Sequence, residues 1–202
     1  MITAEDALQR LREGNARFVS GDIEPGSQHY LVRREQLAAG QEPFAIVVGC
    51  SDSRVPVEIV FDQGLGDLFV IRIAGNVISK TQLGSIEFAA LTFGVRLVVV
   101  LGHTSCGAME AAFATVQGDR QPESDNLRLI VDQIRPSAER AIAEGGTCSQ
   151  AELVDLVGRE NVRRAVNIIR NSRGIIQQLA QENGLMVVGA EYSLATGAVE
   201  FL

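Results

Sequence analysis

Three continuously apolar segments, rich in β-branched residues, limit most strongly what this chain can fold into. They cover residues 44–49, 68–73 and 97–101. Runs of this kind, without alternating polar positions, are typical of strands buried on both faces of a parallel sheet. Residues 83–93, between the second and third runs, have helical periodicity and are followed by Gly94, a common helix end. Strand, helix and strand alternate, so the sequence predicts an α/β fold in which helices cover a parallel sheet.

The C-terminal half supplies further helices and the last strands of this sheet. Helices are predicted at about 126–143, from a capping box at 149–152 into the 170s, and then up to residue 184. Residues 185–190 form a fourth apolar run, and a turn near residue 196 lets residues 198–202 return beside it. We therefore predict a mostly parallel central sheet of about four strands with an antiparallel edge strand, flanked by helices.

The first 40 residues predict a helical arm on a single domain that spans residues 1–202. Apolar residues recur at near-helical spacing before a glycine at position 21, namely Ala4, Leu8, Leu11 and Phe18. A polar linker is predicted at 22–29, followed by a short helix that Gly40 ends. The arm has no core of its own. Its apolar stripe must pack on the main body or on a second subunit, and the sequence allows both.

The charge balance and the cysteine count exclude several classes of function. The 202-residue chain has 18 basic and 25 acidic residues, a net charge of -7, so its field repels phosphate backbones and anionic membrane surfaces. No apolar stretch approaches the roughly 20 residues of a membrane helix, and the acidic start differs from a basic signal peptide. Three cysteines, with Cys148 as an unpaired spare, fit a reducing compartment. We expect a cytoplasmic protein with no nucleic-acid or membrane partner.

Two cysteines and a histidine lie where predicted strands end. Cys50 follows the first strand, His103 follows the third, and Cys106 lies in the next turn. The carboxyl ends of parallel strands meet at one edge of the sheet, where ligands bind in open α/β folds. Taken singly, each of these residues would more often be an ordinary buried side chain. Together they offer sulfur, nitrogen and sulfur, which suits tetrahedral zinc with one open position, the mark of a catalytic site.

An aspartate and an arginine follow the first cysteine. Asp52 is two residues from Cys50, so its carboxylate can reach either the metal or whatever occupies the open position. Arg54 can grip that carboxylate with two hydrogen bonds and hold it ionised and turned off the metal. An ordinary ion pair in an exposed loop would contribute only about 0 to 1 kcal/mol. Beside a metal ligand, we favour a catalytic role for the pair.

Four short motifs are similar to those of the β-class carbonic anhydrases, and the likeness covers nearly the whole chain. They are GNARF at 14–18, CSDSRV at 50–55, RIAGN at 72–76 and GHTSCG at 102–107. The resemblance implies a lyase that reversibly hydrates carbon dioxide to bicarbonate and a proton. It also implies one Zn²⁺ per chain on Cys50, His103 and Cys106, with Asp52 and Arg54 as the catalytic pair.

The resemblance extends to substrate-binding residues and to assembly. It implies that Gln41 and the backbone N–H of Gly107 donate hydrogen bonds to the substrate, and that Phe69 and Phe88 line a small apolar pocket. Plain core aromatics would fit the sequence equally well. We hypothesise that zinc-bound hydroxide, oriented by Asp52, attacks carbon dioxide while Gln41 and Gly107 stabilise the developing charge. Members of the family are commonly dimers or larger homo-oligomers, which the predicted arm also favours.

Two other functions remain open at this point. Carbonyl sulfide and carbon disulfide hydrolases are similar to this family and could use the same zinc site, and fold-level likeness does not separate them. A non-catalytic module that binds zinc or another ligand is the second alternative. The sequence disfavours that module, because it has no glycine-rich phosphate-binding loop and because Asp52 and Arg54 would be superfluous beside an inert metal.

Overall fold

A five-stranded mixed sheet forms the centre of the computed structural model, which describes residues 2–23 and 30–202. The strand order is β2-β1-β3-β4-β5. The first four strands are parallel, and the last pairs antiparallel at the edge. The predicted sheet is therefore confirmed. The strands are β1 (Ala45–Gly49), β2 (Leu68–Arg72), β3 (Leu97–His103), β4 (Met186–Tyr192) and β5 (Val199–Phe201).

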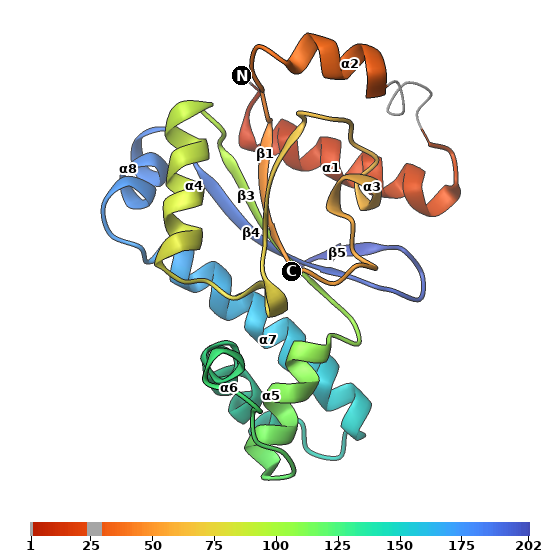
Figure 1. The fold of residues 1–202 in the computed structure, drawn as a ribbon, viewed down its shortest axis with the longest axis vertical. Helices are drawn as coiled ribbons and strands as arrows, with labels where there is room; N and C mark the ends of the chain where they lie inside the picture. The colour runs from red at the N-terminus through yellow and green to blue at the C-terminus, as the bar shows by residue number, and fades with distance from the viewer. Residues whose placement is uncertain (1, 24–29) are drawn as a thin grey trace.

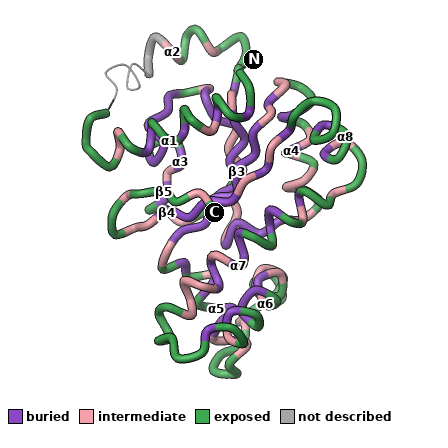
Figure 2. The backbone as a smooth tube through the Cα atoms, turned by 180° about the vertical axis from the view of Figure 1, so that it is seen from behind, coloured by how far each residue is buried: buried purple, intermediate pink, exposed green. Residues whose placement is uncertain are grey.

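Helices pack on both faces of the sheet (Figure 1). Those on one face are α1 (Ala4–Ser20) and α3 (Val57–Val60), and those on the other are α4 (Lys80–Thr92), α7 (Gln150–Arg170) and α8 (Ile175–Glu182). The two central strands between these layers, β1 and β3, are buried along their whole length (Figure 2). Both faces of β1 and β3 meet helices, which explains why their sequences are apolar without alternation.

A third helical group lies beyond the carboxyl ends of the strands, at the lower end of Figure 1. It consists of a short 3₁₀ turn η1 (Ala74–Asn76), α5 (Gly107–Gln117), α6 (Asp125–Glu144) and the start of α7. Its apolar cluster includes Cys50 and Cys106 beside Met109, Ile134 and Val157. The two cysteines are therefore enclosed by helices although they lie at the edge of the sheet.

The N-terminal arm packs on its own chain through its first helix. Leu11 of α1 is fully buried in the core cluster that lies between the sheet and helices α1 and α3. The side chain of Asn15 donates to the carbonyl oxygens of Val60 and Gly197 and accepts from the N–H of Val199. The second helix of the arm is α2 (Tyr30–Leu37), and its Arg33 forms an ion pair with Asp67, the residue before β2. Most of the predicted linker at 22–29 lies outside the described residues.

The structure also corrects several predicted boundaries. Strand β3 includes His103, which was expected just after it. Helix α7 ends at Arg170 with Asn171 as its C-cap, and a separate helix, α8, begins after Gly174, whose φ is 96°. Helices α3 and α5 were not predicted. Neither has a side-chain cap, since Pro56 and Cys106 occupy the N-cap positions, so the usual helix-start signal is missing from the sequence. In the described part of the chain, every helix is too short or too polar to cross a membrane.

Candidate metal centre

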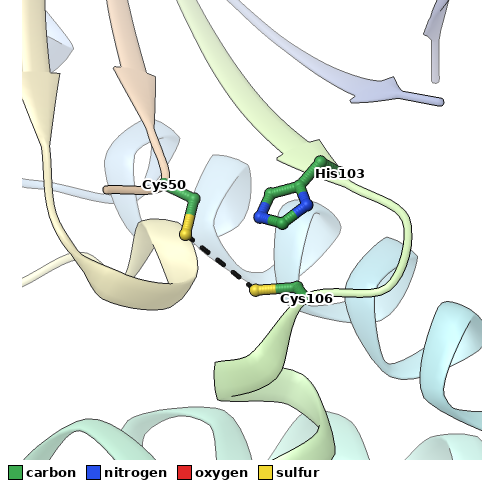
Figure 3. Close-up of side chains that lie close together, drawn as sticks. All are labelled: Cys50, His103 and Cys106. Carbon is green, nitrogen blue, oxygen red and sulfur yellow. Dashed lines mark hydrogen bonds between the residues drawn. The ribbon is translucent and has the colours of Figure 1, made fainter. Parts of the chain in front are cut away.

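Two cysteine sulfurs and one imidazole converge at the carboxyl edge of the sheet (Figure 3). Cys50 directly follows β1, His103 ends β3, and Cys106 is the N-cap of α5. Because Gly49 pairs with Leu101, Cys50 and His103 leave neighbouring strands at nearly the same level. Their candidate ligand atoms, with that of Cys106, all lie within 4.8 Å of one another. The structure thus brings together the three residues that the sequence singled out as metal ligands.

One ring nitrogen of His103 is oriented toward the cysteines without a partner. Nδ1 lies 2.9 Å from the carbonyl oxygen of Thr104, and because a carbonyl only accepts, Nδ1 is the protonated nitrogen. Nε2 therefore carries a lone pair. It is buried and has no hydrogen-bond partner among the described residues. A buried polar atom without a partner is costly, so it points to a ligand that the fold is built to receive.

The spacing of the two sulfurs fits a zinc ion. The Sγ atoms of Cys50 and Cys106 lie 3.9 Å apart. Two sulfurs bound to one tetrahedral zinc at about 2.3 Å each would lie about 3.8 Å apart. Sulfur, nitrogen and sulfur donors also match the ligand preference of zinc. The donor set and its spacing therefore fit the metal that the sequence led us to expect.

Arg54 holds the carboxylate of Asp52 at the edge of this cluster. Its Nε donates to Oδ1 at 2.9 Å and its Nη2 to Oδ2 at 2.7 Å, while the backbone N–H of Arg54 also donates to Oδ1. Arg54 Nη2 further donates to the carbonyl oxygen of Ser105 at 3.2 Å. The Oδ2 atom of Asp52 also lies 3.8 Å from Nε2 of His103. The predicted pair is formed, and its carboxylate borders the candidate metal position.

Two further residues, Arg72 and Gly75, donate hydrogen bonds to the loop of Cys50, and the sequence did not predict these contacts. Arg72 donates from Nε to the carbonyl oxygen of Cys50 at 3.0 Å and from Nη2 to that of Asp52 at 2.6 Å. The backbone N–H of Gly75 points at the Cys50 sulfur, with 3.4 Å between nitrogen and sulfur. Both residues belong to the RIAGN segment at 72–76, whose similarity to the family marked it without giving it a role. These donors fix the loop that carries the first cysteine.

The electrostatic environment favours charge on one sulfur. The hydrogen bond with Cys106 lowers the pKa of the Cys50 thiol, and the side chain of His103 and the N–H of Gly75 lower it further against the opposing effect of burial. The same contact and burial raise the pKa of Cys106. Burial lowers the pKa of His103, but the Cys50 side chain and the Thr104 carbonyl raise it by more. Hydrogen bonds from Arg54 keep the pKa of Asp52 well below its usual range.

The four predicted substrate-binding residues are not all near this cluster within one chain. Gly107 is adjacent to Cys106 and is the first residue of α5. Gln41 precedes β1, so it lies at the opposite end of the strand from Cys50. Phe69 and Phe88 contact each other, with ring centroids 6.2 Å apart, in an aromatic group that also contains Phe93. Phe69 pairs with Ile46, four residues before Cys50, which is about 13 Å along an extended strand.

Comparison with known proteins adds to this geometry. A family described as "Carbonic anhydrase" matches residues 45–199. Carbonic anhydrase 2 of Mycobacterium tuberculosis is 41% identical over 191 residues, which are 95% of this chain and 89% of that protein. The crystal structure of the β-carbonic anhydrase CafA of Aspergillus fumigatus has a TM-score of 0.75 at 29% identity, covering 98% of this chain and 89% of that one.

A more distant structure agrees in fold. One of two tetrameric β-carbonic anhydrases from Sordaria macrospora has a TM-score of 0.77 at 22% identity, covering 98% of this chain and 97% of that one. At that identity the likeness concerns the fold alone. The family match covers most of the chain, and the structure places the sulfur and imidazole donors of the expected site together. The chain belongs to the β-class carbonic anhydrases, enzymes that hydrate carbon dioxide.

Proposed function

We propose that this carbonic anhydrase works with one zinc ion per chain, held by Cys50, His103 and Cys106. The observation that carries the proposal is the buried Nε2 of His103, which lacks a partner among the described residues and lies beside two sulfurs 3.9 Å apart. The described residues bring no fourth cysteine, histidine or carboxylate into the cluster. Three protein ligands leave one tetrahedral position open, as catalysis requires.

The surrounding residues have separate roles in the reaction. Zinc held in this way would supply hydroxide at neutral pH, because it lowers the pKa of bound water to about 7. Asp52, kept ionised by Arg54, accepts a hydrogen bond from the nucleophile and directs its lone pair toward the carbon of the substrate. The backbone N–H of Gly107, at the start of α5, donates to the substrate oxygen on which negative charge develops.

We further propose that the enzyme is at least a dimer, and that Gln41, Phe69 and Phe88 act on substrate at the site of a second subunit. Within one chain, Gln41 lies at the wrong end of β1 to reach the Cys50 site. Phe88 is 53% exposed beside an exposed Leu91, so this aromatic face has room for a partner. The similar enzyme from Sordaria macrospora is described as tetrameric. We also propose a cytoplasmic location, because thiol ligands persist in a reducing compartment.

Zinc analysis combined with stopped-flow hydration of carbon dioxide tests the metal centre. We expect one zinc per chain in the wild-type protein. Cys50→Ser and His103→Ala should lose zinc and hydration together, because each removes one of three protein ligands. Cys148→Ser is the matched control, since this free cysteine is exposed and lies outside the cluster. Full zinc retention in the Cys50 and His103 variants would refute the ligand set.

The same preparations separate carbon dioxide from its sulfur analogues. Relatives that are 41% identical to this chain are named carbonic anhydrases, which favours carbon dioxide as the substrate. We therefore expect hydration to be fast and sulfide release from carbonyl sulfide or carbon disulfide to be slow or absent. Sulfide release without hydration would overturn the choice of substrate, and zinc without any turnover would identify a binding module.

A further inference from the structure

Helix α7 lies against the metal centre although it supplies none of the proposed ligands. Its Gly158 is so close to the site that an added Cβ would lie 3.9 Å from the carbonyl oxygen of His103. Asp155 lies three residues before this glycine and Asn161 three residues after it, and each hydrogen bonds to a different loop of the site. The two side chains therefore flank Gly158 on the part of α7 that passes the site.

Asn161 holds the turn that contacts Cys50. It is 3% exposed, and its Nδ2 donates to the carbonyl oxygen of Gly75 at 2.8 Å. Gly75 has a φ of 66° and directs its own N–H at the Cys50 sulfur. Asn76, the next residue, also has a positive φ, of 41°. Glycine adopts a positive φ readily, but an asparagine does so at a cost, so the hydrogen bond from Asn161 stabilises this turn.

Asp155 holds the loop that carries Cys106. Its Oδ1 accepts a hydrogen bond from the N–H of Ser105 at 3.1 Å. Ser105 has a φ of 54°, a conformation that non-glycine residues seldom adopt. The carbonyl oxygen of the same serine accepts from Nη2 of Arg54. Asp155 is thus linked through one residue to the loop of a proposed ligand and to the arginine that holds Asp52.

We propose that Asn161 and Asp155 are positioning residues, through which α7 holds both ligand loops in the geometry that binds metal. The inference rests on the proposed zinc site. Neither residue touches the reacting atoms, and each acts through a hydrogen bond to the backbone of a loop residue. Partners that orient the ligands of a metal commonly change its affinity by about 10–100-fold when they are removed. The two hydrogen bonds should therefore govern how firmly the protein retains zinc, apart from any effect on folding.

The test measures the rate at which purified, zinc-loaded protein loses its metal to excess chelator, well below the unfolding temperature. Asn161→Leu keeps a similar volume without the donor, and Asp155→Ala removes the acceptor. We expect both to lose zinc at least about tenfold faster than wild type. Asp155→Asn keeps an oxygen that can accept from Ser105 and should restore a rate near wild type. The visible spectrum of the cobalt-substituted proteins should change in the first two variants and not in the third, because it reports on ligand geometry.

Two controls on the same helix separate positioning from general loosening. Asn167→Leu makes the same change at an exposed position of α7 and should leave zinc loss unchanged. Ile169→Val shortens a fully buried side chain of the core cluster further along α7, so it should lower the melting temperature without speeding zinc loss from the folded protein.

The outcomes distinguish this inference from the site on which it rests. Wild-type rates of zinc loss in folded Asn161→Leu and Asp155→Ala would overturn the inference, as would an equal acceleration in Ile169→Val. Asp155 is only partly buried, so its variants keep the question answerable if Asn161→Leu does not fold. A wild-type protein that binds no zinc would overturn the metal centre itself, and this inference with it.

Discussion

Arg54 combines an exposed position with a demanding set of contacts. Its side chain is 55% exposed, yet it binds both carboxylate oxygens of Asp52 and the carbonyl oxygen of Ser105. An exposed ion pair contributes little to the stability of a fold. The contacts therefore matter mainly for where the carboxylate points, because a two-point grip fixes its orientation as a single charge would not.

Replacing Arg54 should consequently affect turnover far more than folding. We expect Arg54→Ala to lower kcat/KM by about 10–100-fold with little change in the melting temperature. The kcat/KM of Arg54→Lys should lie between those of wild type and Arg54→Ala, because lysine keeps the positive charge but lacks the planar guanidinium that binds both carboxylate oxygens. Arg120→Ala is a matched control, since this exposed arginine pairs with Glu123 away from the metal centre. Unchanged hydration by Arg54→Ala would mean that the pair is merely structural.

Glu191 predicts a pH dependence of stability. It is 6% exposed, and burial raises its pKa above the usual value of 4.5, although Arg159, 2.8 Å away, partly opposes this. Because the pKa of Glu191 is higher in the folded protein than in the unfolded chain, its protonated carboxyl contributes stability at pH values below the unfolded pKa. That contribution is lost as the pH rises through the folded pKa. Glu191→Gln removes this titration.

The stability of Glu191→Gln relative to wild type should therefore increase as the pH rises from below 4.5 toward neutrality. Urea unfolding at several pH values and one fixed protein concentration measures the difference. Glu200→Gln is the control, because this exposed carboxylate pairs with the same Arg159. A difference that does not vary with pH would show that Glu191 does not titrate as inferred.

At the residue scale, the sequence was most informative where chemistry restricts the choice of side chain. Cys50, His103 and Cys106 were predictable because few residues bind zinc and because parallel strands deliver them to one edge. Arg72 and Gly75 were not, since each acts on the loop of Cys50 from a neighbouring segment whose path depends on tertiary packing. Asn161 gave no signal at all, because a lone asparagine in a helix resembles any other.

Among the elements, two glycines within helices show how packing overrides helix propensity. An added Cβ on Gly14 of α1 would lie 1.9 Å from the carbonyl oxygen of Phe61, whereas one on Gly84 of α4 would meet nothing within 4 Å. Backbone atoms cannot move aside cheaply. Gly14 therefore lets α1 approach α3 closely, and Gly84 only weakens its own helix.

Alanine at these two positions should have opposite effects. We expect Gly14→Ala to destabilise the fold by about 1–3 kcal/mol or more through overpacking. Gly84→Ala should stabilise it by up to about 1 kcal/mol, the difference in helix propensity. Chemical denaturation of both variants measures the two changes. Equal effects of the same sign would show that α1 does not pack on α3 as described.

The elements themselves were predictable to different degrees. The parallel strands were found from their apolar runs, and α7 from its capping box, since Ser149 accepts from the N–H of Glu152, the third helical residue. Helix α5 escaped notice because it begins with Gly107 and has no side-chain cap. Its N-cap is Cys106, which lies in the cluster with Cys50 and His103, and such long-range packing is not expressed in the local sequence.

The molecule as a whole raises the question of where Gln41 acts. Mixing two inactive variants answers it. Cys50→Ser chains lack a proposed metal ligand but keep Gln41. Gln41→Ala chains keep all three proposed ligands but lack Gln41. If the site is shared between subunits, a hybrid dimer contains one complete site. Random assembly of an equal mixture should then recover about a quarter of wild-type hydration, because half of the dimers are hybrids with one of two sites intact.

A mixture of Cys50→Ser and His103→Ala chains is the control for this experiment. Both ligands come from one chain, so no hybrid site is complete and no activity should return. Hydration should also be measured before and after the chains are allowed to exchange. Recovery no greater than the average of the unmixed variants would rule out a shared site and remove Gln41 from the proposed machinery.

Asn15 has a consequence for how the protein is made. It joins the first helix to Val60 and, far along the chain, to Gly197 and Val199. A growing chain that folds as it leaves the ribosome has no Val199 to bind until the 184 residues that separate it from Asn15 have been added. The first helix is thus made early and secured late, which makes the newborn enzyme sensitive to anything that slows synthesis between these two points.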